Sequence, residues 1–441
     1  MSSHPWKDIV MRVLFVSSMN KSHVYLMAPL AWAMRTAGHD VRFASQPDLA
    51  ADVASIGFLP VPIGPSMDSL AEQMAEAEPQ EDPFAPATAP GVGAKPRQGE
   101  YSGVDPVGLM DHLVSEFYQM LTPDSAIDDL VDYARQWRPD LVIWHTLAFA
   151  GPVAAKVSGA AHARMPWGVD THAQVRSEWR RLRTERGNEA VADPLEQWLG
   201  PILERHGEEF DESVALGQWT VDPAPSWVFH PAGAGLHYVP FRQVPFHGPA
   251  TVPSWVEEPR TRRRVCVTLG FSHREAQRPE AASDNLLEAV ADLDVEVVAT
   301  LDAKQLGSLS RLPDNVRAVE FVPLTALLPS CSAVVHHGGP GTFATAVEHG
   351  VPQLIVPGTY WHIKWWGPIG QANGLEDRGA GVYVADADQL TPALLRDQLV
   401  RVLDDPSFGR NAARLRTEAI GTPSINEVVP MLEKLTREHR G

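Results

Sequence analysis

Apolar residues in this chain gather in short runs that alternate with longer segments of helical period. Residues 13–16 form one apolar run, residues 24–36 repeat apolar side chains at helical spacing, and residues 41–44 form a second run. Gly38 ends the helical segment, because glycine readily adopts the left-handed conformation that closes a helix. A strand, a helix and a second strand of these lengths predict a βαβ unit with a parallel sheet.

The same alternation continues through the rest of the chain. In the first half, the pattern predicts a strand at 141–144 and helices at 109–121, 152–157 and within the charged region 178–207. In the second half, it predicts helices at 281–293 and 392–403 and strands at 264–269, 295–300, 318–322, 333–336 and 354–356. Strands that alternate with helices are typical of doubly wound α/β domains.

Length and linker composition predict two such domains. A chain of 441 residues can form two or three domains, each with its own core. Residues 241–262 carry repeated prolines and little apolar period, which is typical of a linker. We therefore expect an α/β protein with two Rossmann-like domains facing a central cleft, over residues 1–240 and 263–420. Residues 421–441 should form a helix, whose docking surface the pattern does not define.

One long segment departs from this pattern. Residues 76–103 are rich in Pro, Ala, Gly and Glu without an apolar period, so they predict a long loop. Such a loop is as compatible with a lid over a substrate as with a surface insertion that has no role in binding.

Composition excludes several classes of protein. An apolar share of 44% and a charged share of 21% are typical of a soluble globular chain. The net charge of -18 argues against a nucleic-acid or anionic-membrane surface, which needs clustered Lys and Arg. Apolar runs of membrane-spanning length and a signal-peptide core are both missing, so a cytoplasmic protein is expected. The two cysteines, Cys266 and Cys331, predict no disulfide framework and no zinc site.

The most informative motif joins the predicted strand 333–336 to a helix-like run. It reads His336-His337-Gly338-Gly339-Pro340-Gly341-Thr342. Backbone N–H groups, the positive end of a helix dipole and a histidine would meet there, and together they suit an anionic oxygen. The motif therefore predicts a seat for a nucleotide phosphate, and a turn without a ligand is the structural alternative.

Four blocks of the chain, residues 11–38, 137–152, 210–225 and 336–352, resemble the antibiotic-pathway glycosyltransferases that attach deoxysugars to macrolides and related polyketides. The resemblance implies an inverting enzyme of the two-Rossmann-domain (GT-B) fold. Its N-terminal domain would bind a small-molecule aglycone, and its C-terminal domain would bind a TDP-sugar as co-substrate, with no resident cofactor.

Sugar transfer needs a base for the acceptor hydroxyl. The resemblance implies that His23, between the first predicted strand and its helix, is this base. The family usually orients the base with a carboxylate on a later strand end, where this chain carries His145. A second imidazole could hold His23 by a hydrogen bond but could not stabilise an imidazolium as a carboxylate does, so either His145 or another acid such as Asp170 would serve. His39, after the helix stop, is expected to be a surface turn residue.

On the donor side, the resemblance places His337 on a diphosphate oxygen, in the turn that contains Gly338. The N–H groups of Gly339 and Gly341 and the Thr342 hydroxyl would lie beside it. Further donor contacts are implied at Thr268 and Gly270 after the first strand of the second domain, and at residues 321–324, where the backbone around Val322 would read the pyrimidine ring.

The segment 361–371 departs from relatives that use glucose. Those relatives carry an acidic residue followed by Gln, whereas this segment is rich in tryptophan and has no acidic residue. Unmatched buried polar groups are costly, so an aromatic loop fits a deoxygenated sugar, including an amino sugar. Trp361, Trp365 and Trp366 could face this sugar or could be core residues.

Metal dependence is not expected. The acidic pairs at 292–294 and 386–388 imitate a cation site, but their turn-like surroundings favour solvated acids, and a helix N-terminus with histidine can neutralise a leaving diphosphate. A nucleotide-sugar epimerase and a non-catalytic binding protein are the alternative functions. The resemblance also allows a helper protein similar to a haem-free monooxygenase, for which the charged region 178–207 is a candidate surface, and a homodimer.

Overall fold

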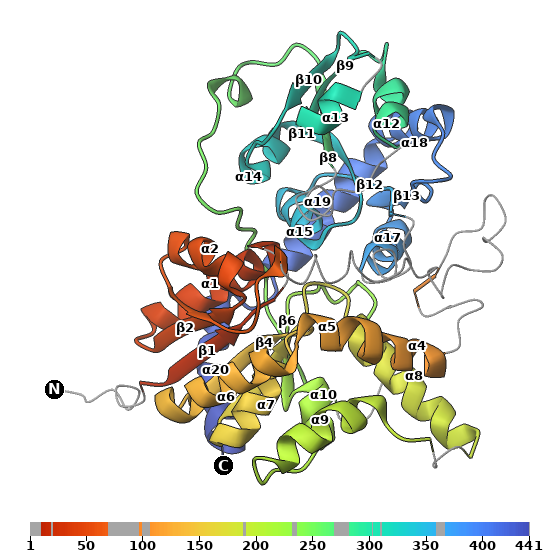
Figure 1. Ribbon diagram of the computed structural model, residues 1–441. Coiled ribbons are helices and arrows are strands. Elements are labelled where there is room, and N and C mark those ends of the chain that lie inside the picture. Colours follow the sequence, from red (N-terminus) through yellow and green to blue (C-terminus); the bar gives the residue numbers. More distant parts are fainter. Residues whose placement is uncertain are drawn as a thin grey trace.

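Two parallel β-sheets, each covered by helices on both faces, form the frame of the molecule (Figure 1). The computed structural model describes residues 10–18, 21–68, 97–98, 106–187, 191–231, 236–268, 282–301, 303–308, 311–358 and 367–440. The expected α/β architecture with two Rossmann-like domains is confirmed by these two sheets.

The first sheet has seven strands, which pair in parallel in the order β3-β2-β1-β4-β5-β6-β7. Their bounds in chain order are β1 Arg12–Val16, β2 Asp40–Ser45, β3 Leu59–Pro62, β4 Leu141–His145, β5 Ala161–Met165, β6 Trp219–Asp222 and β7 Tyr238–Pro240. Successive side chains of β1 enter opposite cores, with Leu14 and Val16 on one face and Val13 and Phe15 on the other. Because β1 is buried on both faces, its sequence is a continuous apolar run, and this run is what predicts the strand.

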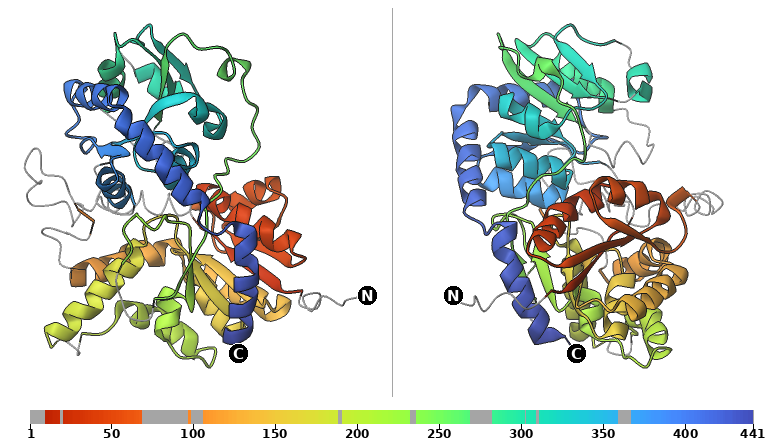
Figure 2. Two further views of the ribbon diagram at one scale, coloured as in Figure 1. Left: turned by 180° about the vertical axis from the view of Figure 1, so that it is seen from behind. Right: turned by 90° about the vertical axis from the view of Figure 1, so that its left-hand side faces the viewer.

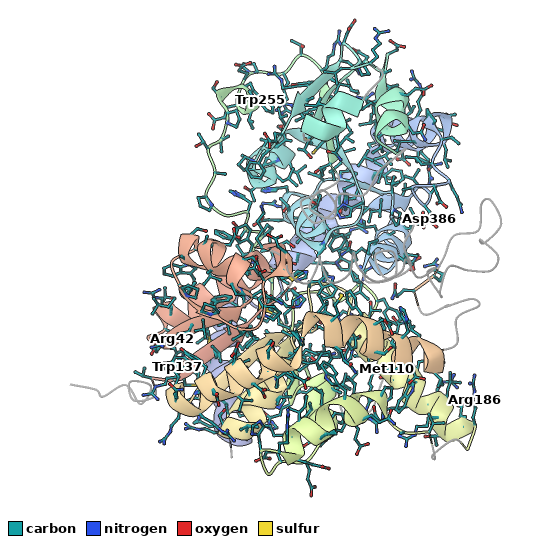
Figure 3. All side chains as sticks on the ribbon, in the orientation of Figure 1. Arg42, Met110, Trp137, Arg186, Trp255 and Asp386 are labelled. Atoms are coloured by element: carbon teal, nitrogen blue, oxygen red, sulfur yellow. The ribbon has the colours of Figure 1, made fainter. Side chains whose placement is uncertain are left out.

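Helices of the first domain lie on both faces of this sheet. Their bounds are α1 Lys21–Thr36, η1 Pro47–Leu49, α2 Ala50–Ser55, α4 Pro106–His112, the π-helical turn η2 Leu113–Tyr118, α5 Gln119–Leu121, α6 Asp124–Trp137, α7 Ala150–Ser158, α8 Thr171–Glu185, α9 Pro194–Glu204 and α10 Glu212–Leu216. At the outer side of the sheet, the Arg42 guanidinium lies over the Trp137 ring (Figure 3).

The second sheet has six parallel strands in the order β10-β9-β8-β11-β12-β13. Their bounds are β8 Arg263–Thr268, β9 Val295–Thr300, β10 Val316–Val319, β11 Cys331–His336, β12 Gln353–Ile355 and β13 Gly381–Tyr383. The helices around it are α12 Ala282–Val290, α13 Ala303–Ser308, α14 Leu324–Leu327, η4 Leu328–Ser330, α15 Pro340–His349, α17 Pro368–Asp377, α18 Pro392–Asp404 and α19 Pro406–Ile420.

The chain crosses between the two sheets twice. After β7 it reaches β8 through residues 241–262, which contain the short helix η3 (Ser254–Val256). At the other end, α20 (Ile425–His439) returns to the first domain, where Figure 2 shows it as the dark blue helix. Its buried side chains Val428 and Leu432 join the core formed by α1 and the first sheet. The C-terminal helix therefore docks on the first domain.

Two sequence expectations need correction. The strand expected at 318–322 lies at Val316–Val319, because this segment pairs with β9 while Val322 turns away into the core beside α14. His39 is not a surface turn residue: its side chain is 1% exposed. Its Nδ1 accepts the Met11 N–H at 3.2 Å and its Nε2–H donates to Glu433 of α20 at 3.1 Å, so it helps to dock that helix.

Candidate active site

The first sheet reverses its strand order between β1 and β4, and two predicted site residues lie at this point. From β1 the chain winds towards β2, and from β4 it winds the other way towards β5. His23 lies in the first turn of α1, just after β1, and His145 is the last residue of β4. Ligands of open α/β sheets bind in the crevice at such a switch point.

The His23 ring is held by a backbone carbonyl. Its Nδ1 lies 2.9 Å from the Ser18 oxygen, which can only accept, so Nδ1 carries the proton and donates it. The other ring nitrogen, Nε2, then presents a lone pair. Burial lowers the pKa of His23 to about 4 despite this hydrogen bond, so the ring is neutral at pH 7. A neutral, oriented imidazole of this kind can accept a proton from a hydroxyl.

His145 does not hold His23 by a hydrogen bond. The two rings are stacked, with centroids 4.0 Å apart and an interplanar angle of 20°. Trp167, from the loop after β5, lies nearly parallel to both, 5.2 Å from His23 and 4.7 Å from His145. His145 is fully buried, and burial together with the nearby His23 lowers its pKa well below the usual value.

Asp170 does not orient His23 either. Its carboxylate pairs with the buried Arg164 and accepts hydrogen bonds from the Tyr238 hydroxyl and from the Ala173 N–H at the start of α8. Asp170 therefore caps a helix and compensates a buried charge, and the carbonyl of Ser18 takes the orienting position that the sequence left open.

Buried polar atoms gather around these strand ends. The Ser17, Ser18 and Thr146 hydroxyls and Nε2 of His145 are buried and have no hydrogen-bond partner among the residues that the structure describes. Unpaired buried polar groups are uncommon, and each calls for an explanation such as a polar ligand.

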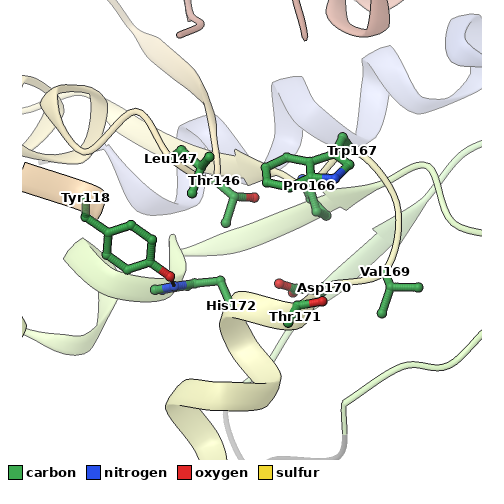
Figure 4. A pocket seen from close by; sticks show the side chains of 9 residues that line it. All are labelled: Tyr118, Thr146, Leu147, Pro166, Trp167, Val169, Asp170, Thr171 and His172. Atoms are coloured by element: carbon green, nitrogen blue, oxygen red, sulfur yellow. Dashed lines mark hydrogen bonds between the residues drawn. The ribbon is translucent and has the colours of Figure 1, made fainter. Parts of the chain in front are cut away.

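A small cavity of about 10 Å³ lies beside Trp167 (Figure 4). The residues that line it are Tyr118, Thr146, Leu147, Pro166, Trp167, Val169, Asp170, Thr171 and His172. Its wall contains several rings, and Trp167 belongs both to this wall and to the stack on His23. The pocket therefore lies next to the candidate base.

The second sheet has its own switch point, between β8 and β11. Thr268 ends β8 and pairs in register with His336 at the end of β11. The Thr268 hydroxyl accepts a hydrogen bond from Thr300 at 2.7 Å. His336 is buried, with one ring nitrogen bonded to Gln353 Oε1 and the other accepting the Gly338 N–H. His336 thus shapes the turn, and burial lowers its pKa to about 4.

The glycine turn brings backbone and a histidine to the start of α15. Gly338 has φ +93, and a Cβ there would lie 2.8 Å from Cα of Pro368. Gly339 is the N-cap residue of α15, and a Cβ there would lie 2.8 Å from the His337 ring. Gly341 and the mostly buried Thr342 occupy the first turn of the helix. His337, the N–H groups and the Thr342 hydroxyl therefore lie together at a helix end that favours anions.

A second helix, α17, begins beside this turn. Its N-cap residue is Gly367, followed by Pro368, which contacts Gly338. Gln371, in the first turn, is 1% exposed, and its Oε1 has no hydrogen-bond partner within the described part of the chain. Two helix N-termini therefore meet at the end of β11.

The loop that carries Trp167 joins the two sites. A Cβ built on Gly168 would lie 3.6 Å from Pro340 and 3.5 Å from Gln371, both in the second domain. The next residue, Val169, contacts Gly370 of α17. His23 and the glycine turn thus face the same loop from the two domains.

Other predicted residues take different positions. Gly270, Trp361, Trp365 and Trp366 lie outside the described residues. Val322 buries its side chain in the core, which leaves only its backbone for a ligand.

The acidic pairs differ from each other. Asp292 and Asp294 are exposed, as expected, but Asp386 is not a solvated acid (Figure 3). It is buried and accepts a 2.5 Å hydrogen bond from the hydroxyl of Tyr383, the last residue of β13, three positions earlier in the chain. Within the part of the chain that is described, no three His, Cys, Asp or Glu side chains are placed to hold a metal ion.

Several site residues escaped the sequence analysis. The Ser18 carbonyl, Trp167, Thr146 and Gln371 reach the site through backbone geometry and through the packing of segments that are distant in sequence, so no local pattern indicates them. Trp167 follows β5, whose sequence Ala-His-Ala-Arg-Met does not resemble a buried strand. No helix among the described residues has the length and apolar character needed to cross a membrane.

Comparison with known proteins places the chain among named transferases. Residues 32–270 and 284–435 match the N- and C-terminal domain models of erythromycin biosynthesis protein CIII-like proteins. The chain is 49% identical to aclacinomycin-T 2-deoxy-L-fucose transferase of Streptomyces galilaeus, covering 98% of this chain and 97% of that protein. It is 41% identical to 3-alpha-mycarosylerythronolide B desosaminyl transferase of Saccharopolyspora erythraea, covering 98% and 99%.

Among solved structures, glycosyltransferase VinC in complex with DTDP is similar, with a TM-score of 0.80 and 39% identity. The match covers 97% of this chain and all of that one. The likeness extends over both domains.

Proposed function

The chain belongs to the erythromycin biosynthesis protein CIII-like family of antibiotic-pathway glycosyltransferases, and on that premise we propose that it transfers a deoxysugar from a TDP-sugar to a hydroxyl of a polyketide-type aglycone, with inversion. Relatives named as transferases match over the full chain, so neither the epimerase nor the non-catalytic alternative is retained. A TDP donor is supported by the VinC complex with DTDP.

The observation that carries the mechanism is the orientation of His23. The Ser18 carbonyl fixes the Nδ1–H tautomer, so Nε2 can take the proton of the acceptor hydroxyl as its oxygen attacks the anomeric carbon. The bond from that carbon to the diphosphate oxygen breaks, and TDP leaves. Attack on the side opposite to the leaving group inverts the anomeric centre in a single displacement.

The departing diphosphate gains negative charge, which the second domain can receive. The N-terminus of α15, the His337 ring and the Thr342 hydroxyl offer donors and a positive helix end. These groups suit the leaving group without a resident cofactor or metal ion, and we include metal independence in the proposal. Activity in excess EDTA tests it, and loss of turnover there would contradict it.

The donor is proposed to be a deoxysugar, including amino sugars. Related transferases are named for 2-deoxy-L-fucose and desosamine. Comparing TDP-deoxysugars with UDP-glucose as donors tests this choice, and a preference for UDP-glucose would contradict it.

The central experiment replaces His23 by alanine. Acceptors for the assay are aklavinone, 10-deoxymethynolide and tylactone, the aglycones for which three relatives are named. His23→Ala should lower kcat about 10²- to 10⁴-fold, since it removes the base, and should leave TDP binding unchanged. His206→Ala, in the turn after α9, is the matched control and should keep full turnover. Intact turnover in His23→Ala would exclude this mechanism.

Two further proposals concern protein partners, a helper protein and a second copy of this chain. A helper protein would meet the exposed part of α8, where Arg181 pairs with Glu178 and Glu185. Arg181→Glu should then abolish stimulation by a co-expressed helper but keep the basal activity. A homodimer is tested by the mass of the chain in light scattering.

A further inference from the structure

Gln98, which belongs to the segment 76–103 that the sequence predicts to be a long loop, lies between the two domains. Its side chain and backbone are buried, with 9% of the residue exposed. The Gln98 N–H donates to Asn373 Oδ1 at 2.9 Å, in α17 of the second domain. Its side-chain amide donates to Gln174 Oε1 at 2.8 Å, in α8 of the first domain. One residue therefore bonds a helix of each domain.

The contacts of α17 with the first domain are closest around Gln98. A Cβ built on Gly370 would lie 3.5 Å from Gln98 Cγ and 2.8 Å from Val169 Cγ2, so both side chains reach the helix backbone. At the other end of α17, Arg97 forms an ion pair with Asp377 at 2.9 Å, but these side chains are 48% and 57% exposed. Exposed ion pairs contribute little, so the buried hydrogen bonds of Gln98 are the stronger tie.

The two helices that Gln98 joins lead to the two halves of the candidate site. Helix α17 begins at Pro368, which contacts Gly338 in the glycine turn. Gln174 lies near the start of α8, which follows the loop that carries Trp167. The Trp167 ring is stacked on His23. Gln98 thus connects the helix at the phosphate seat with the segment that packs against the base.

We infer that Gln98 is a positioning residue, which holds α17 and the donor at a fixed place relative to His23 by bonding α17 and α8 at once. The inference rests on the proposed function, because it concerns the alignment of donor and base in sugar transfer. Gln98 acts through the two helices and touches no reacting atom. A misplacement of about 1 Å in such a site can cost about 10²-fold in rate. Because α15 and His337 lie in the second domain, Gln98 should affect turnover and not TDP affinity.

The test uses two variants that remove the same hydrogen bond. Gln98→Met has nearly the same length and keeps the backbone bond to Asn373, and Gln174→Met removes the partner in α8. At saturating TDP-deoxysugar and aglycone, each variant should lower kcat about tenfold and leave the Kd of TDP within about twofold. The double variant should lower kcat no further, because the bond is already lost in either single variant. Arg97→Ala is the control and should keep kcat within about twofold, since its ion pair is exposed.

Hydrogen exchange measures the link between the domains without turnover. In the wild type, TDP binding to the second domain should slow amide exchange in the first turns of α8, because Gln98 connects this helix with α17. In Gln98→Met this slowing should be lost, whereas TDP should still protect the start of α15. A role in folding alone would instead lower Tm and TDP affinity together with kcat.

Three results would overturn the inference. The first is a kcat of Gln98→Met equal to that of the wild type, and the second is a fall in kcat matched by equal losses of TDP affinity and Tm. The third is unchanged protection of α8 by TDP in Gln98→Met. Each of them would leave the proposed function intact. A wild-type chain that binds TDP but transfers no sugar would overturn the proposed function, and the exchange measurement would still decide whether Gln98 links the domains.

Discussion

At the scale of single residues, the site depends on side chains whose protonation is set by what surrounds them. His23 and His145 stand where a base and a carboxylate are expected, yet the second imidazole is stacked on the first and the orienting acceptor is the Ser18 carbonyl. A carbonyl fixes the tautomer but carries no full charge to stabilise an imidazolium. The proton must therefore be accepted by a ring that strongly favours its neutral form.

This environment predicts the pH dependence of transfer. Burial lowers the pKa of His23 from 6.5 to about 4, so the basic form persists as the pH falls through 6 and 5. We expect the acid limb of kcat/KM, which reports the free enzyme, near pH 4. The limb of kcat should lie at a higher pH, because a bound diphosphate brings negative charge that favours the protonated ring.

Initial rates between pH 4 and 8 test this, with circular dichroism at each pH to confirm that the chain remains folded. A limb of kcat/KM centred near 6.5 would show that His23 titrates like a solvated histidine, and the burial argument would fail.

At the scale of elements, the glycine turn between β11 and α15 places two helix N-termini side by side. Gly338 needs a positive φ, and a side chain there would collide with the backbone of Pro368 at the start of α17. Gly341, two residues into α15, has open space around its Cβ position and no such backbone constraint. The two glycines are thus a matched pair: the backbone conformation and the close contact require glycine at position 338, but nothing requires it at position 341.

Gly338→Ala should destabilise the chain by more than about 2 kcal/mol, since a left-handed conformation alone costs an L-residue about 1–2 kcal/mol and the contact with Pro368 adds to it. It should also weaken TDP binding, because α15 and α17 must separate. Gly341→Ala should leave stability unchanged or raise it by up to about 1 kcal/mol. Denaturant unfolding and calorimetry with TDP measure both effects, and equal stability of the two variants would contradict the argument.

The elements also show what the sequence could predict. Strands β1, β4, β8, β9 and β11 are read correctly because burial on both faces leaves a continuous apolar run. The pattern does not predict strand β5, because β5 carries the buried Arg164. Asp170 compensates its charge and the Thr220 hydroxyl accepts a hydrogen bond from it, and both contacts are visible only in three dimensions. The edge strand β3 was missed because its two prolines argue against a strand.

The residues of the candidate site also divide into those that a local sequence pattern predicts and those that it does not. A histidine after a strand and a glycine turn before a helix are local patterns, so His23 and the α15 turn could be predicted. Trp167, Thr146 and Gln371 reach the site only because β4 and β5 are neighbours and because the two domains meet at Gly168.

At the scale of the whole molecule, the last two helices of the chain connect its two domains. Helix α19 packs against α15 in the second domain, and α20 then crosses to the first, where a capping box of Ser424 and Glu427 starts it. The buried apolar side of α20 completes the core on one face of the first sheet, and Glu433 bonds the buried His39. Stability of the first domain therefore depends on residues encoded at the far end of the chain.

Adjacent residues of α20 allow this dependence to be measured. Leu432 is fully buried against the first domain, whereas Met431 is 44% exposed. Leu432→Ala should lower the free energy of unfolding by about 2–5 kcal/mol through the cavity that it leaves, and Met431→Ala should change it by less than about 0.5 kcal/mol. The TDP affinity of folded Leu432→Ala should match that of the wild type, because its cavity opens in the first domain, away from the α15 turn. If both variants melted alike, α20 would not support the first domain, and if TDP binding fell with Leu432→Ala, the two domains would be coupled more tightly than their separate cores indicate.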